Sequence, residues 1–270
     1  MVQSVKVSEI VKRRRETEDS DSDIDISSTD SETEVGLDQN EEVVNVDFDF
    51  YDGNKNVDFH ALKHLMRQLF GSHESNRIQL SALADMILDS PTTTIKTDGP
   101  ESDPYSFLSL VDYKANRNSD YAQYLHKIDD RLSKQLNKIE ASNQSCAMLL
   151  GERLINMPPE IIAPLYRITL EDALKNSGNG KHYDWYVIVS RKFEVNLDVD
   201  QDEQQKQSAK KRARTAEIDY FHPEDAFFER HAALHFDGDG RKGLIPTYVV
   251  ISHDSLNKAI AECELEIAKW

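Results

Sequence analysis

The stretch HYDWYVIVSRKFEV, residues 182–195, decides the fold class, because it is the strongest strand signal in the chain. Valine, isoleucine and aromatic side chains recur in it, and these favour a pleated, half-buried surface. Two further strands are predicted after it, at 226–236 and 247–252, on either side of a glycine-rich turn. A helix follows at 255–270, with Ser255 as a candidate N-cap. The C-terminal part of the chain therefore predicts strands followed by a helix.

The chain before this strand also mixes strands and helices. Residues 146–156 fit either a buried strand or a helix, and we favour the strand. Pro158 and Pro159 end it and occupy the first turn of a helix that runs to residue 176. The other predicted elements are helices at 58–70, 79–88 and 120–136 and strands at 43–52, 92–98 and 105–113, with Asp58 capping the first helix and Gly71 ending it. Adjacent strands between helices predict an α+β fold, with a mixed central sheet flanked by helices.

The strand predicted at residues 43–52, VVNVDFDFYD, carries carboxylates as well as apolar residues. Apolar and polar residues alternate from Val44 to Phe50, which is the period of a half-buried strand. Aspartate is uncommon in strands, because its side chain competes for backbone hydrogen bonds. The candidate docking residues are therefore Asp47, Asp49 and Asp52. They either dock a basic partner or keep an edge strand from pairing with another chain.

The charge balance limits the classes of partner. The 270 residues include 49 acidic and 32 basic side chains, a formal net charge of −17. Such a field repels nucleic acid and attracts basic proteins, so we expect no direct nucleic-acid partner. Cys146 and Cys263 form no CxxC motif, which suits a reducing compartment. Because no apolar run reaches the ~20 residues of a membrane span and no secretory signal is visible, we expect an intracellular, soluble protein.

Residues 1–42 have the composition of a disordered acidic tail, separate from one folded domain at 43–270. Between Glu16 and Glu42 there are twelve carboxylates and no lysine or arginine, and apolar residues are sparse. Acidic residues follow several hydroxyls at the spacing that acid-directed kinases of the casein kinase two type require. The candidate phosphorylation sites are Ser20, Ser22, Thr29 and Ser31. The tail either carries these modifications or simply keeps the protein in solution.

Two basic clusters stand out from this acidic background. One lies near the N-terminus and the other in a polar, low-complexity segment at 198–217, which we interpret as a flexible basic insertion. The candidate import-signal residues are Lys12, Arg13, Arg14 and Arg15, and Lys210, Lys211, Arg212 and Arg214. They are either nuclear import signals or merely solvated charge.

Motifs for catalysis and metal binding are mostly missing. The chain has no GxxxxGK[ST], GxGxxG, GxSxG or HExxH motif. His60 and His64 are four residues apart, as are His231 and His235, but no nearby ligand set completes a metal site. We therefore predict no catalytic residue, no metal and no cofactor.

Four segments together resemble the BCCIP family, whose fungal members are the Bcp proteins. The most specific is LLGERLINMPPEIIAPLY, residues 149–166, and the others are 44–52, 60–70 and 92–99, in the same order as in the family. The resemblance covers residues 43–270. It implies a nuclear or nucleocytoplasmic protein, a role in nuclear export and large ribosomal subunit formation as a dedicated chaperone of a ribosomal protein, and a fold similar to the GNAT acetyltransferases.

The GNAT resemblance raises the possibility of an enzyme, which the residues argue against. GNAT enzymes hold the pyrophosphate of acetyl-CoA on backbone N–H groups of a [QR]xxGx[GA] loop at a helix N-terminus. QLFGSH, residues 68–73, matches only its first half, because His73 replaces the small residue. Where the loop belongs, the chain has NMPPEI, residues 156–161, with two prolines that lack N–H donors and an added glutamate. We expect a GNAT-like fold without its CoA loop.

The resulting hypothesis is a non-enzymatic escort of a basic ribosomal protein that shuttles between nucleus and cytoplasm with import and export receptors. The acidic strand and tail would neutralise the client's lysines and arginines until RNA replaces them. The first alternative is a nuclear-export adaptor or scaffold for a lipid kinase, such as a phosphoinositide kinase, or for cell-cycle regulators. The second is a degenerate GNAT-type acetyltransferase.

Overall fold

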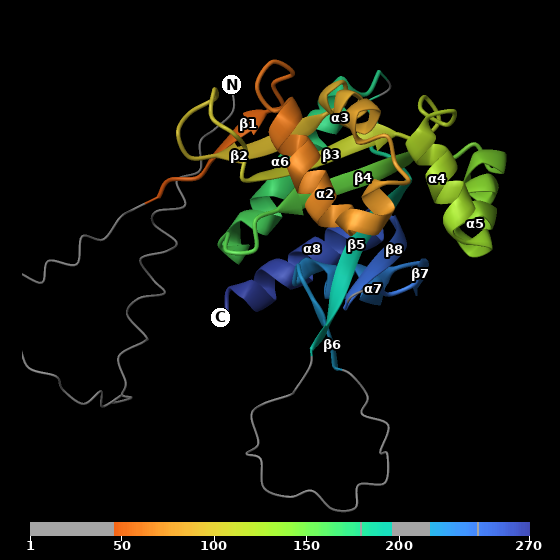
Figure 1. Ribbon diagram of the computed structural model, residues 1–270. Coiled ribbons are helices and arrows are strands. Elements are labelled where there is room, and N and C mark those ends of the chain that lie inside the picture. Colours follow the sequence, from red (N-terminus) through yellow and green to blue (C-terminus); the bar gives the residue numbers. More distant parts are fainter. Residues whose placement is uncertain (1–45, 179, 196–216, 242) are drawn as a thin grey trace, which may run out of the picture.

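A computed structural model describes residues 46–178, 180–195, 217–241 and 243–270, which form one sheet with helices on both faces (Figure 1). The strands are β1 (Asp49–Asp52), β2 (Thr92–Lys96), β3 (Ser106–Asp112), β4 (Cys146–Arg153), β5 (Trp185–Val195), β6 (Glu217–Tyr220), β7 (Leu234–Asp237) and β8 (Leu244–Ser252). The helices are α2 (Phe59–Ser75), α3 (Leu80–Leu88), α4 (Asp120–Ile128), α5 (Asp130–Ala141), η2 (Pro159–Ile161), α6 (Ile162–Asn176), α7 (Glu224–His231) and α8 (His253–Ile267).

The sheet is mixed, as the sequence predicts, and mostly antiparallel. Its strand order is β1-β2-β3-β4-β5-β8-β7, and β6 pairs with β5 off this path. Among the described strands, only β4 and β5 pair in parallel; β5 pairs with β8 along most of its length, from Trp185 opposite Ser252 to Phe193 opposite Leu244. The segment at 182–195 therefore forms an interior strand that is paired on both edges, and the favoured strand at 146–156 is confirmed as β4.

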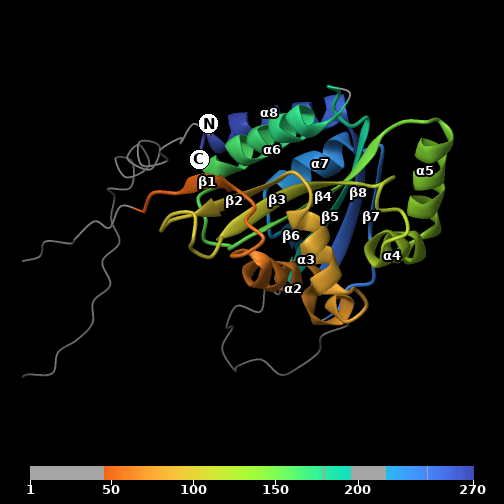
Figure 2. The ribbon, with the colours of Figure 1, turned by 90° about the horizontal axis from the view of Figure 1, so that it is seen from above.

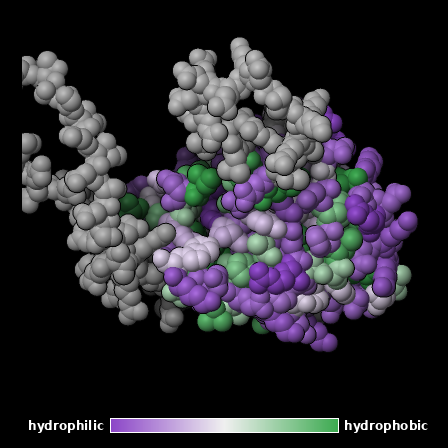
Figure 3. All heavy atoms as spheres, turned by 90° about the horizontal axis from the view of Figure 1, so that it is seen from below, coloured by the Kyte–Doolittle hydropathy of each residue, from purple (hydrophilic) through white to green (hydrophobic). Residues whose placement is uncertain are grey.

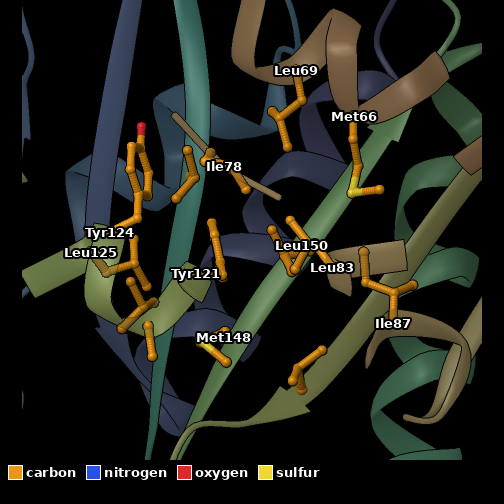
Figure 4. Packing of buried hydrophobic residues seen from close by; sticks show 14 of the residues in the cluster. Met66, Leu69, Ile78, Leu83, Ile87, Tyr121, Tyr124, Leu125, Met148 and Leu150 are labelled. Carbon is orange, nitrogen blue, oxygen red and sulfur yellow. The ribbon is translucent and has the colours of Figure 1, made fainter. Parts of the chain in front are cut away.

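Two hydrophobic layers hold the helices to the sheet. Figure 2 shows α6 and α8 along one side of the sheet and α2 and α3 along the other, with α4 and α5 beyond the far end. In the first layer, side chains of α2, α3 and α4 pack against β4, with Met66, Leu83 and Tyr121 lying over Met148 and Leu150 (Figure 4). The second layer joins α6, α7 and α8 to the opposite sheet face. Burial of these apolar side chains is the main stabilising contribution to the fold.

The helix predicted at 120–136 is two helices, α4 and α5. Asp129 interrupts it with an extended backbone, φ −153° and ψ 137°, and its side chain accepts a hydrogen bond from the N–H of Arg131. Aspartate competes for backbone donors in this way and therefore favours a helix start over a helix interior. Within the described residues, none of the helices is long and apolar enough to cross a membrane.

The prediction of a strand at 226–236 is wrong for most of that range. Its first residues belong to helix α7, and only β7 is extended. Pro223 directly before the helix, and two acidic residues in its first turn, Glu224 and Asp225, are signals of a helix start that outweigh the β propensity of the phenylalanines. Strand β6 has no predicted counterpart, and its first residue, Glu217, was included in the insertion predicted at 198–217.

Two predicted caps and one predicted helix end are also wrong. Asp58 makes no cap hydrogen bond to α2 and instead pairs with Lys96, as described below. Ser252, not Ser255, caps α8 by accepting the N–H of Ser255. Gly71 does not end α2 but kinks it, with φ 67° and ψ 173°, and helical residues follow to Ser75. A Cβ at this position would lie 2.6 Å from the Leu244 side chain, so glycine is required here for both backbone and packing reasons.

Candidate functional site

The parallel strands β4 and β5 separate and leave a wedge between them. They pair only from Cys146 with Trp185 to Leu149 with Ile188. Farther along, the same edge of β5 pairs with β6, from Lys192 with Tyr220 to Val195 with Glu217. In sheets with parallel strands, ligands commonly bind beyond the carboxyl ends of those strands. This wedge is therefore a candidate ligand-binding site.

Charged side chains fill the wedge. Arg153 at the end of β4 donates two hydrogen bonds to Glu224 of α7, one of them at 2.9 Å from Nη2 to Oε2, and both side chains are buried. Glu152 lies 2.7 Å from His222 Nε2 and 3.1 Å from an Arg191 guanidinium nitrogen. A buried ion pair thus fixes helix α7 to β4, and another joins β4 to β5; no single segment of sequence reveals them.

The two carboxyl groups at the start of α7 have pKa values shifted in opposite directions. Although burial by itself raises the pKa of Glu224, the Arg153 guanidinium outweighs it and holds that pKa below its usual value. Burial, together with the charge of Glu224, raises the pKa of Asp225 to about 7. Asp225 accepts a hydrogen bond from the Ser190 hydroxyl. A carboxyl group that titrates near neutral pH suits acid–base chemistry, but it needs access to a substrate.

The wedge offers little such access. The remaining cavity, bordered by Glu152, Arg153, Ser190, His222 and Asp225, has a volume of about 30 Å³. That space holds roughly one or two water molecules, which would hydrogen-bond the polar groups around it. Nowhere in the described residues do three or more histidine, cysteine, aspartate or glutamate side chains gather closely enough to hold a metal ion.

The junction after β4 has no phosphate-binding loop. Pro158 precedes the 3₁₀ turn η2, which begins at Pro159 and passes directly into α6. Prolines supply no N–H donors, and Glu160 adds negative charge at the helix start. The half-match at residues 68–73 is explained by packing, because its glycine is the kink of α2 against Leu244.

The structure does not bring the three candidate docking aspartates onto one face. Asp49 lies opposite Lys96 in the register of β1 with β2, whereas Phe50 lies opposite Ile95 and packs into the second hydrophobic layer. Asp52 is two residues after Phe50, so its side chain lies on the same face of the strand as Phe50 and on the opposite face from Asp49. The single acidic face is thus corrected to carboxylates on both sides of β1, the edge strand.

Asp52 instead lines a groove that includes acidic residues the sequence reading missed. The groove has a volume of about 530 Å³ and lies between the ends of β1, α3 and α6. Asp89 and Asp172 line it with Asp52, and Lys175 lies 2.8 Å from Asp172. These residues are far apart in the chain and follow different elements, so no local motif could have grouped them.

The remaining candidate residues lie outside the described part of the chain. They are the phosphorylation candidates Ser20, Ser22, Thr29 and Ser31 and the import-signal candidates Lys12, Arg13, Arg14, Arg15, Lys210, Lys211, Arg212 and Arg214. Their assignments stay predictions.

Comparison with known proteins agrees with the fold and the motifs. The model of the BCCIP family matches residues 43–228. Protein BCP1 of Candida glabrata is 58% identical over 277 residues, covering 100% of both chains. Protein BCP1 of Saccharomyces cerevisiae is 56% identical over 237 residues, covering 85% of this chain and 84% of that protein. The crystal structure of BCP1 from Saccharomyces cerevisiae matches with a TM-score of 0.74 and 55% identity, over 88% of this chain and 96% of that chain. The chain therefore belongs to the BCCIP family.

Proposed function

We propose that this protein is a non-enzymatic escort of a basic large-subunit ribosomal protein, acting in ribosome biogenesis and nuclear export. It shuttles between nucleus and cytoplasm with import and export receptors. The observation that carries the proposal is the excess of negative charge, −17 over the whole chain, together with the carboxylates on both sides of the edge strand β1. In the coloured part of Figure 3, hydrophilic residues occupy more of the surface than hydrophobic ones, which suits contacts with a charged client.

Electrostatics supports this role physically. Ribosomal proteins are rich in lysine and arginine, and alone they bind RNA or other anions indiscriminately. An acidic surface lowers the free energy of the client's charges and speeds its capture, while RNA, with its denser charge, can replace it. The groove lined by Asp52 gives basic side chains a concave place to bind, where they would compete with Lys55 for Asp89 and with Lys175 for Asp172.

Capture from cells tests the identity of the client. We expect affinity purification at low salt to recover one basic large-subunit ribosomal protein in near-stoichiometric amount, and washing at high salt to release it. Mass spectrometry identifies the recovered proteins. Recovery of a lipid kinase or cell-cycle regulators without such a ribosomal protein would instead favour the adaptor role.

Acetyl-CoA binding tests the non-enzymatic part of the proposal. Because Pro158 and Pro159 supply no N–H donors and the wedge retains only about 30 Å³, isothermal titration with millimolar acetyl-CoA should show no binding. A dissociation constant in the micromolar range would contradict the proposal and favour a degenerate acetyltransferase.

Removing charge from β1 tests where the client docks. The triple change Asp47→Asn, Asp49→Asn and Asp52→Asn keeps side-chain size and leaves the buried Phe50 unchanged. We expect a slower association rate with the client and a flatter salt dependence, because clustered charge acts mainly on the rate of encounter. Stopped-flow fluorescence at several salt concentrations measures both quantities.

A matched control separates local docking from overall charge. The changes Asp130→Asn, Glu194→Gln and Asp239→Asn also remove three carboxylates, which lie exposed in α5, β5 and the turn after β7, whereas Asp49 is half-buried. These should leave the association rate closer to that of the unmodified protein. Equal slowing by both triples would show that only net charge matters and that β1 is no docking site.

A further inference from the structure

A groove between α2 and α3 is positively charged, although the molecule as a whole is negatively charged. It has a volume of about 550 Å³ and is lined by Lys63, Arg67, Ser72, Ser75, Asn76, Ile78, Leu80 and Ser81. These residues include two cations, three hydroxyls and an amide, and no carboxylate. In a chain with a net charge of −17, such a surface is unlike its surroundings.

The two cations are free to bind an anion. Lys63 and Arg67 are four residues apart on α2, so their side chains lie on the same face of the helix. Within the described part of the chain neither forms an ion pair, and Lys63 Nζ lies over the Phe59 ring, 5.2 Å from its centroid. Arginine can bind a phosphate group through two parallel hydrogen bonds, and lysine adds a mobile positive charge.

A second observation is a serine hydroxyl beside the groove that lacks a hydrogen-bond acceptor. Among the described residues, the buried hydroxyl oxygen of Ser75 has no hydrogen-bond partner. A buried hydroxyl left unsatisfied costs free energy, and rotation of the Ser75 side chain toward the groove would let a phosphate oxygen accept its hydrogen bond. The nearby acidic groups are already engaged: Glu74 binds Arg77 and His73, and Asp120 accepts the N–H of Gln79.

We propose that this groove binds phosphoserine in the acidic tail of the same chain, at Ser20 or Ser22. A phosphoserine carries about −1.5 to −2 charges and three acceptor oxygens, which match a lysine, an arginine and neighbouring hydroxyls. The groove is much larger than one phosphate, so it also accommodates the flanking peptide. The adjacent aspartates in DSDSD complement Lys63 and Arg67 without phosphate, but without the bidentate geometry.

Tethering makes a weak site effective. Ser22 precedes Val46, the first described residue, by 24 residues, which can span up to ~80 Å when extended. A domain of this size has a radius of gyration of only about 17 Å, so the tail can reach the groove. The effective concentration of a tethered segment is of millimolar order, enough to occupy a site of modest affinity. Phosphorylation would then withdraw part of the acidic tail from basic partners.

Peptide binding tests the proposal with the full-length, unphosphorylated protein. The probe is a fluorescent peptide of residues 17–34 phosphorylated at Ser20 and Ser22, followed by anisotropy. We expect saturable one-to-one binding, at least five-fold weaker binding of the unphosphorylated peptide, and at least five-fold weakening by the double change Lys63→Gln and Arg67→Gln. The control changes Lys134 and Lys138 to Gln, two exposed cations with the same four-residue spacing on α5, and should leave the affinity unchanged.

The source of the phosphate is tested in the same assay. Protein phosphorylated on its own tail should bind the probe at least five-fold more weakly, because its groove is already occupied. Absence of probe binding, equal binding of both peptides, or equal loss in both double variants would overturn the site. Unchanged probe binding by the phosphorylated protein would overturn the assignment to its own tail, as would binding of inositol hexakisphosphate without binding of the phosphopeptide. An unchanged melting temperature shows that the variants remain folded.

Discussion

Changing Lys96 to Met is expected to lower the free energy of unfolding by about 3–5 kcal/mol. The Lys96 ammonium lies in β2 with no exposed surface, 2.7 Å from the equally buried Asp58 carboxylate and 2.6 Å from the Pro100 carbonyl. Methionine fills a similar volume but leaves Asp58 with one remaining donor, the N–H of Asn54 at 2.8 Å. A buried, uncompensated carboxylate is costly, and urea denaturation followed by circular dichroism measures the loss.

Two further variants show whether this loss comes from the buried charge. Adding Asp58→Asn to Lys96→Met removes the uncompensated charge while keeping an acceptor for Asn54, so most of the stability should return. Lys175→Met breaks an exposed pair with Asp172 of comparable length, and should have a much smaller effect on stability because solvent screens that pair. If Lys96→Met proved as mild as Lys175→Met, the buried pair would not contribute as its geometry suggests.

Changing Arg153 to Met is expected to be about as damaging at pH 8, again about 3–5 kcal/mol, because Glu224 loses its bidentate partner inside the wedge. The loss should be smaller at pH 5.5. Without Arg153, burial is left to raise the pKa of Glu224 above its unfolded value, so the folded variant binds more protons than the unfolded chain and gains stability as the pH falls. Urea denaturation at the two pH values gives the comparison.

The unmodified protein is the reference for this pH effect. The pKa of Asp225 is raised to about 7, so the unmodified protein also gains stability as the pH falls from 7 towards the pKa of Asp225 in the unfolded chain. The effect of Glu224 is therefore the difference in pH dependence between the variant and the unmodified protein. Adding Glu224→Gln should remove that pH-dependent difference. Arg167→Met, which breaks an exposed pair with Glu264, should cost less than about 1 kcal/mol. An equal loss at both pH values would contradict the assignment to Glu224.

Local sequence patterns predict most of this fold, because the energies that form its main elements are local or periodic. The run of β-branched residues in 182–195 can bury both faces only in the interior of a sheet, and β5 lies between β4 and β8. The segment at 226–236 fails because its phenylalanines favour a strand, whereas Pro223 and the acidic first turn favour a helix. The position of Asp52 follows from the sequence alone: in an extended strand, side chains three residues apart point to opposite faces, which places Asp52 and Asp49 on different sides.

The wedge and the groove could not be predicted in this way. Arg153 and Glu224 are 71 residues apart, and nothing near either residue indicates its partner. Lys63 and Arg67 resemble any exposed face of an amphipathic helix until α3 is packed beside them. Such sites depend on tertiary contacts, which a single sequence records only indirectly.

The hairpin of β5 and β6 has a consequence for how this domain can change over time. Its paired ends, Val195 and Glu217, hold the two termini of the segment at 196–216 side by side. Even for a fully flexible segment, doubling its length would cost only about 0.6 kcal/mol of closure entropy. Insertions and deletions between these two residues are therefore nearly neutral for stability, so the length of this segment can change while the sheet that carries it stays the same.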